Sequence, residues 1–110
     1  MDWQQDAPVG GPLVGRPIGK VDETTWEVFQ THLLAAVAEA ATLNVPLVVD
    51  LSQLEYMSSR GLRVLKIAKD AAGSERPITL AAPNDRMRQI FQISRYDMLF
   101  TVVDDVSSAV

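Results

Sequence analysis

The sequence contains no cysteine and only one histidine, His32, among its 110 residues. The absence of cysteine excludes disulfide frameworks, thiol nucleophiles and thiolate metal sites. No apolar run approaches the roughly 18 to 20 residues that a membrane span needs, since the stretch 35–41 is interrupted by Glu39. The first residues lack the basic and apolar regions of a secretory signal. We therefore expect a cytoplasmic protein with no metal, no cofactor and no membrane insertion.

Hydrophobic residues make up 47% and charged residues 22% of the chain, which is the composition of one folded domain. The net charge of −4 disfavours nucleic acid as a partner. The charge is unevenly divided, because residues 1–55 carry −6 and residues 56–110 carry +2. Much of the basic half comes from Arg60, Arg63, Lys66 and Lys69, whose three-residue spacing indicates one solvated side of a helix.

The first half of the chain predicts an arm, a strand and a helix. Residues 1–12 contain two prolines and two glycines and are expected to form a loose arm, with the folded domain over residues 13–110. Leu13–Val21 alternates weakly, and Pro17 favours an edge position if this segment is a strand. A helix is predicted from Trp26 to about Leu43, with Thr24 and Glu27 at capping-box spacing. His32 falls beside the apolar face of this helix and is expected at the surface.

The second half alternates short apolar runs with amphipathic segments. The predicted strands cover residues 46–51, 77–82 and 99–103; the predicted helices run from Ser58-Ser59 to Gly73 and onward from Asn84-Asp85. This order favours an α/β fold with a mostly parallel central sheet of about four strands and amphipathic helices packed on it. The strand at 46–51 is continuously apolar, so we expect it to be central.

The segment from Asp50 to Leu62 is the candidate site, because function in such sheets gathers where strands lead into helix N-termini. Two adjacent hydroxyls, Ser58 and Ser59, stand at the predicted helix start. A phosphate on one would be favoured by the helix dipole, and serine is also a common capping residue. No G-x-S-x-G elbow, P-loop or dinucleotide fingerprint is present, and His32 offers no base within reach of either serine. We therefore predict no catalytic residues.

The run VVDLSQLEYMSSRGLRVL, from Val48 to Leu65, resembles the signature of STAS domains, the sulphate transporter and anti-sigma-factor antagonist family. That signature is a buried strand, D-L-S, an aromatic and an apolar residue, then [D/S]-S-x-G-L leading into a helix. Gly19-Lys20-Val21-Asp22 is similar to the family's G-x-[L/V]-D before its first helix, and 83–94 is similar to its third helix. The resemblance covers roughly residues 13–105.

The resemblance implies a function as well as a fold. Small single-domain members act as anti-sigma-factor antagonists that bind a serine-kinase anti-sigma factor when unphosphorylated, are phosphorylated by it, and are restored by a serine phosphatase. The family's phosphoacceptor lies two positions before the motif glycine, which corresponds here to Ser59 before Gly61. Around this serine we expect partner binding to involve Asp22, Ser58, Arg60, Gly61 and Arg63.

The chain departs from the family pattern at Ser58, where aspartate is frequent, and at Arg60, where a small residue is usual. Arg60 could pair with a phosphate on Ser59, pair with an acidic partner, or have no special role. Two other classes of function stay open. One is a STAS-like structural or regulatory subunit of a lipid-transport ABC complex, and the other is a small serine hydrolase, for which no base is evident.

Overall fold

The structure is a computed structural model that describes residues 1–109. Within that range the strands are β1 (Asp2–Asp6), β2 (Leu13–Val21), β3 (Leu47–Asp50), β4 (Leu54–Met57), β5 (Ile78–Ala81) and β6 (Thr101–Val103). The helices are α1 (Trp26–Leu43), α2 (Ser59–Ala72), α3 (Asp85–Ile93), the single turn α4 (Tyr96–Leu99) and the 3₁₀ turn η1 (Val106–Ala109).

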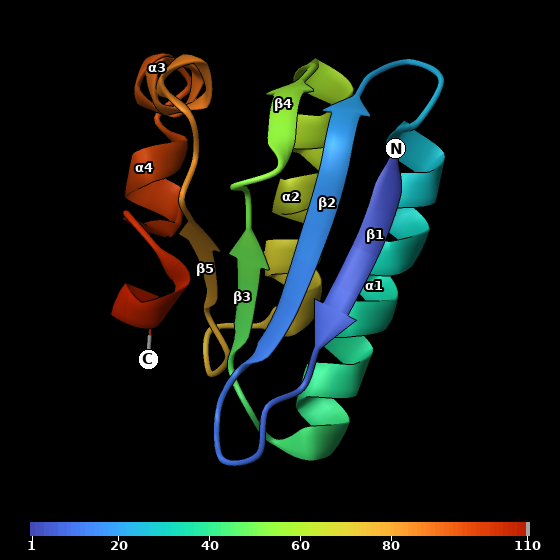
Figure 1. Cartoon of the computed structure of the whole chain (residues 1–110), viewed down its shortest axis with the longest axis vertical. Helices are drawn as coiled ribbons and strands as arrows, with labels where there is room; N and C mark the ends of the chain where they lie inside the picture. The colour runs from blue at the N-terminus through green and yellow to red at the C-terminus, as the bar shows by residue number, and fades with distance from the viewer. Residues whose placement is uncertain (110) are drawn as a thin grey trace.

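The strands form one mixed sheet in the order β1-β2-β3-β5-β6, and β4 pairs with β2 beyond the end of β3 (Figure 1). Only β1 runs antiparallel to its neighbour; the other pairings are parallel. The predicted α/β class, mostly parallel sheet and central position of β3 are confirmed. The sheet has six strands rather than about four, because β1 and β4 were not predicted.

The prediction of a loose arm over residues 1–12 is wrong for Asp2–Asp6, which pair with β2 along their whole length. Trp3 anchors this strand by stacking on the exposed His32 ring, at a centroid distance of 5.6 Å. A Cβ on Gly15 would lie 2.4 Å from the Trp3 ring, so the glycine provides the space that the indole occupies. The single aromatic in a polar segment therefore fastens β1 to the fold.

Pro17 lies inside the sheet, not at an edge as predicted, because β2 has partners on both sides. Leu13 N–H donates to the carbonyl of Pro46, and Gly19 N–H donates to that of Gln53. Every second residue of β2, counted from Leu13, therefore directs its N–H to the side of the strand where β3 and β4 lie. Pro17 faces the same side, where β3 pairing has ended at Gly15 and β4 pairing has not begun before Gly19. Its missing N–H therefore leaves no ladder bond unmade.

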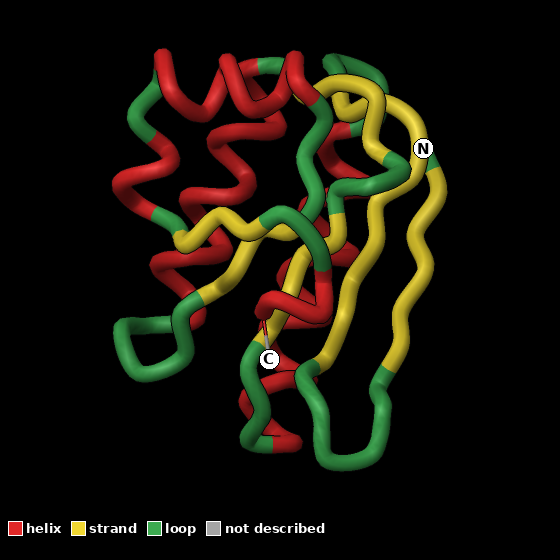
Figure 2. Tube along the Cα trace, turned by 60° about the vertical axis from the view of Figure 1, so that its left-hand side comes forward, coloured by secondary structure: helices red, strands yellow, loops and turns green. Residues whose placement is uncertain are grey.

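The two long helices, α1 and α2, cover one face of the sheet, while η1 crosses the other face (Figure 2). Both helices have the predicted bounds, and their small and branched apolar residues form the main core with β2, β3 and β5. A smaller cluster of Val14, Val48 and Ala81 packs beneath η1. Within residues 1–109, none of the helices combines the length and hydrophobicity needed to cross a bilayer.

Candidate functional site

The carboxyl ends of β2 and β4 meet at one end of the molecule, the upper end in Figure 1, where α1 and α2 begin. Ser58 N–H donates to the Val21 carbonyl at 2.8 Å, which ties the start of α2 to the end of β2. Asp22 follows Val21 directly, so the fold brings the two separated sequence motifs together. This contact depends on β4, a strand that the sequence did not reveal because it is only four residues long and partly exposed.

Asp22 organises the loop that leads into α1. Its Oδ1 accepts hydrogen bonds from Thr24 N–H at 2.9 Å, Thr24 Oγ1 at 2.8 Å and Thr25 Oγ1 at 3.2 Å. The hydrogen bonds from Thr24 and Thr25 lower the pKa of Asp22 and favour its ionised form. The capping box predicted for Thr24 and Glu27 is not formed, because the N-cap is Thr25 and its hydroxyl bonds back to Asp22 and Lys20.

Ser58 and Ser59 have different environments although they are adjacent. Ser58 is the N-cap of α2, as expected, but its side chain makes no capping bond. Its Oγ is buried and has no hydrogen-bond partner among the described residues. Ser59 is exposed as the first residue of the helix. Of the two hydroxyls, only that of Ser59 is open to a macromolecule in solution.

Gly61 is buried where α2 crosses β2 and β4. A Cβ at this position would lie 2.2 Å from Met57 Cγ and 2.8 Å from Val21 Cγ1, closer than packed atoms approach. The glycine therefore allows the helix N-terminus to sit directly on the two strands. Its predicted association with a partner can only be indirect, through the position that it gives to Ser59.

Arg60 bridges the starts of the two long helices. Its Nε lies 3.0 Å from Glu23 Oε2, and its guanidinium carbon lies 5.0 Å from the centre of the Trp26 ring. Half of the Arg60 side chain is exposed, at 51%, so the ion pair is solvated and easily exchanged for another. The Arg60 side chain next to Ser59 is thus directed toward the start of α1 by a weak, solvated ion pair.

Arg63 lies one turn further along α2 and is exposed, like Arg60 and Lys66, which confirms the predicted solvated face for these three residues; Lys69 is half-buried. These arginines line a groove of about 680 Å³ between α1 and α2, together with Trp26, Gln30, Ser59, Val64 and Ile67. The exposed predicted site residues of α2 therefore line the same groove as the Trp26 side chain of α1. Its basic and apolar lining is suited to another protein more than to a metal or a nucleotide.

The ion pair between Arg16 and Asp50 was not predicted and lies away from this groove. Arg16 Nε lies 2.7 Å from Asp50 Oδ2, and Asp50 is 5% exposed. Burial opposes ionisation of Asp50, but hydrogen bonds from Arg16 and from Ser52 N–H outweigh it and lower its pKa.

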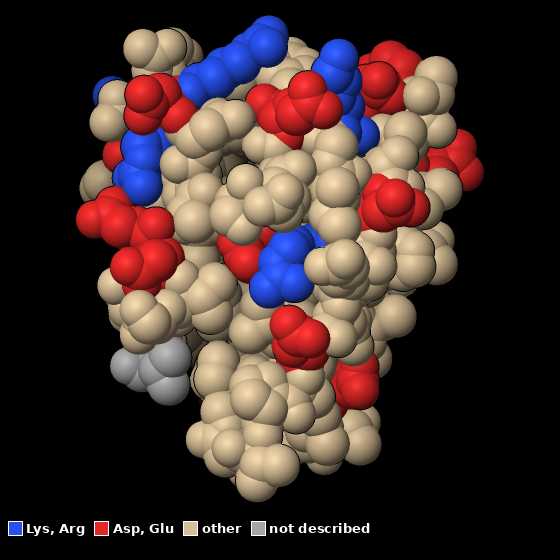
Figure 3. Space-filling model, in the orientation of Figure 1, with Lys and Arg blue, Asp and Glu red and all other residues tan. Residues whose placement is uncertain are grey.

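On the face viewed in Figure 3, basic and acidic side chains alternate without a continuous basic patch. Residues 1–109 hold no group of three or more metal-ligating side chains.

Comparison with known proteins places the chain in the STAS domain family. The family model described as "Mlab, STAS domain" matches residues 18–103. Among curated proteins, BtrV of Bordetella bronchiseptica, which is assigned as an anti-sigma factor antagonist, is 29% identical over 102 residues. That alignment covers 92% of this chain and 85% of BtrV. The resemblance seen in the sequence is therefore confirmed at the level of the family.

Solved structures confirm the fold. An anti-sigma factor antagonist from Mycobacterium paratuberculosis superposes with a TM-score of 0.87 at 23% identity, covering 98% of this chain and 89% of that one. The Bacillus cell fate determinant SpoIIAA, in its phosphorylated form, superposes with a TM-score of 0.65 at 19% identity. This superposition covers 92% of this chain and 90% of the SpoIIAA chain.

Proposed function

We propose that this protein is a non-enzymatic anti-sigma-factor antagonist whose partner binding is switched by phosphorylation of Ser59. Unphosphorylated, it binds a serine-kinase anti-sigma factor and so frees the sigma factor; phosphorylated, it releases the kinase; a serine phosphatase returns it to the binding form. The observation that carries the proposal is the exposure of Ser59 at the first position of α2, beside Ser58, whose Oγ is buried.

The start of α2 favours the phosphorylated product electrostatically. The first intrahelical bond runs from Leu62 N–H to the Ser58 carbonyl, so the N–H groups of residues 59–61 have no helical acceptor. A phosphate at this end interacts favourably with the helix dipole and with these donors. Arg60 adds a cation next to the acceptor, where it can leave the solvated Glu23 for the stronger charge of a phosphate.

The reaction requires no catalytic group from this chain. Ser59 Oγ attacks the γ-phosphorus of ATP in the kinase; the Oγ–P bond forms, the bond to the β-phosphate oxygen breaks, and ADP leaves. The hydroxyl proton passes to a base of the kinase. The phosphatase later directs water onto the phosphorus and releases inorganic phosphate. The added charge of about −1.5 to −2 then lies beside the α1–α2 groove, where docking would have to desolvate it.

Support for the partner class comes from the relatives. BtrV is assigned as an anti-sigma factor antagonist, and the fold is shared with an antagonist and with SpoIIAA, whose structure is known in a phosphorylated form. The serine of the family signature falls at Ser59, with Gly61 two residues later. These features together favour an anti-sigma-factor partner over the structural subunit of a transporter.

The test is phosphorylation by a serine-kinase anti-sigma factor from the same organism. The purified kinase and ATP with Mg²⁺ are incubated with wild type, Ser59→Ala and Ser58→Ala, and phosphosites are mapped by mass spectrometry. We expect one phosphate on Ser59 of the wild type and of Ser58→Ala, and none on Ser59→Ala. Modification of Ser58 instead, or none in the wild type, contradicts the proposal. Copurification with a permease and its ATPase instead of the kinase would favour the transporter alternative.

A further inference from the structure

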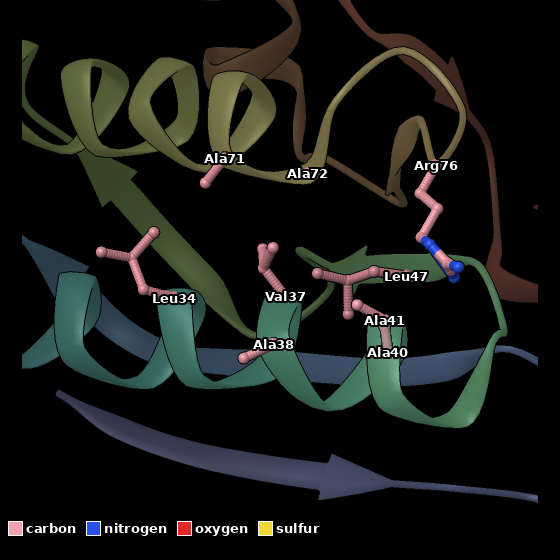
Figure 4. A pocket seen from close by; sticks show the side chains of 9 residues that line it. All are labelled: Leu34, Val37, Ala38, Ala40, Ala41, Leu47, Ala71, Ala72 and Arg76. Carbon is pink, nitrogen blue, oxygen red and sulfur yellow. The ribbon is translucent and has the colours of Figure 1, made fainter.

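A second groove lies at the opposite end of the α1–α2 pair, away from Ser59. It has a volume of about 360 Å³ between the C-terminal halves of the two helices (Figure 4). The buried side chains of Val37, Ala40 and Leu47 form its floor. Exposed alanines form its rim: Ala38 and Ala41 from α1, and Ala71 from α2. These side chains are too short to cover the floor, so the groove stays open.

The single charged group of the groove is Arg76, in the loop between α2 and β5. Its side chain reaches across one end of the groove toward Leu47 (Figure 4). Arg76 is half-buried, and it forms no ion pair with any residue that the structure describes. A guanidinium that is partly desolvated against an apolar wall, and that is not paired with a carboxylate, attracts an anion.

The size of the groove restricts its occupant. Its volume lies at the lower end of the roughly 300–1,000 Å³ of small-molecule sites, which are mostly apolar with a few placed polar groups. Stable protein interfaces bury about 800 Å² on each partner and need a wider surface than this. An apolar floor with one cation at one end fits a molecule with a narrow hydrocarbon body and one anionic head.

We propose that this groove binds a single-chain fatty carboxylate, with the chain over Val37 and Leu47 and the carboxylate paired with the Arg76 guanidinium. The site is independent of the switch at Ser59, because it is built from the other ends of both helices. A bound chain would fill the space between α1 and α2 and hold the two helices together at that end.

The test is a titration of the ¹⁵N-labelled full chain with sodium decanoate, followed by amide chemical shifts. We expect saturable shifts confined to residues 34–47 and 71–76. Acetate, which has the head without the chain, and decyltrimethylammonium, which has the chain with the opposite charge, should produce no saturable shifts there. Binding of the cation as tightly as decanoate, or no saturable shifts with decanoate, would overturn the proposal.

Three variants locate the contacts. Arg76→Gln should weaken decanoate binding by at least about tenfold, the loss expected for a hydrogen bond to a charged group. Ala38→Leu fills the groove from an exposed helical position that should tolerate the change, and should abolish binding. Lys66→Gln, which removes one positive charge elsewhere on α2, should bind like the wild type. Unchanged affinity in either of the first two variants contradicts the site. Shifts at the same residues that depend on protein concentration without ligand would show a second copy there, and would also overturn it.

Discussion

At the scale of single residues, the site depends on positions where the size or the burial of one side chain decides the local structure. Gly61 is the clearest case, because its Cα hydrogen faces Met57 and Val21 at distances that exclude a methyl group. Ser58 and Ser59 show the complementary point: the Oγ of Ser58 is buried, whereas Ser59 at the next position is exposed. Burial, not residue type, decides which of the two hydroxyls another macromolecule can reach.

Gly61→Ala should destabilise the fold. The overpacking costs about 1–3 kcal/mol, which outweighs the roughly 1 kcal/mol that alanine gains over glycine in helix propensity. Urea unfolding should show a lower midpoint for this variant. Ser59→Ala serves as the control, and its stability should stay within about 0.5 kcal/mol of the wild type because the side chain is exposed. Equal stability of Gly61→Ala and wild type would show that the helix has room to move.

Arg60→Gln should raise the second pKa of a phosphate on Ser59, because the neighbouring cation favours the dianion. Phosphorus NMR of the phosphorylated protein as a function of pH measures this value directly. Arg63→Gln, one turn away, should change it less. If the two variants and the wild type titrate together, Arg60 does not contact the phosphate and remains paired with Glu23.

Asp50→Asn should lower stability at pH 7 by about 3 kcal/mol, the low end for a broken buried ion pair, since Arg16 is partly exposed. The pKa of Asp50 is lowered on folding, so its contribution is present above the unfolded pKa of about 3.9 and is lost as pH falls through the folded value. Urea unfolding at pH 7 and pH 3 should therefore show a difference between variant and wild type that shrinks in acid. A difference independent of pH would contradict this.

At the scale of elements, the positions of helices followed from the sequence better than the pairing of strands. The amphipathic pattern placed both ends of α1 and α2, since their buried residues recur on one face and Gly73 ends the second helix. The strand β4 was missed because it is short and partly exposed, and β1 because its polar residues hide a single anchoring tryptophan. Both depend on contacts with distant residues, which local patterns do not contain.

Asn84 connects the start of α3 to β4. Its Oδ1 accepts from Met87 N–H at 2.8 Å and caps α3, while its Nδ2 donates to the carbonyls of Leu54 and Glu55 at 3.2 and 3.1 Å. Asn84→Ala should cost about 1–2 kcal/mol by urea unfolding, the upper part of the range for a lost cap. It should also speed hydrogen exchange at the Met87 amide. Gln89→Ala, exposed on the same helix, is the control; equal losses in both variants would contradict the role of Asn84.

At the scale of the whole molecule, the fold explains why two sequence motifs form one site. Parallel strands end at the same side of a sheet, so the loop after β2 and the loop after β4 meet where both long helices begin. Both motifs could be identified in the sequence, and the sequence predicted the class of fold. It did not predict the groove that connects Ser59 and Arg63 to Trp26, because a groove depends on the distance between helices that are remote in the chain.

The uneven charge of the sequence also takes a definite place in the molecule. The basic half begins with α2, and its first arginine spans the gap to the acidic start of α1. A phosphate on Ser59 would add negative charge next to this arginine.

The most direct measurement is the affinity of the purified serine-kinase anti-sigma factor for wild type, Ser59→Ala and Ser59→Asp by calorimetry. Wild type and Ser59→Ala should bind alike, and Ser59→Asp should bind at least about tenfold more weakly, because a fixed negative charge must be desolvated at the interface. Circular dichroism should show the same fold for all three proteins. Binding of Ser59→Asp as tight as that of the wild type would contradict the switch.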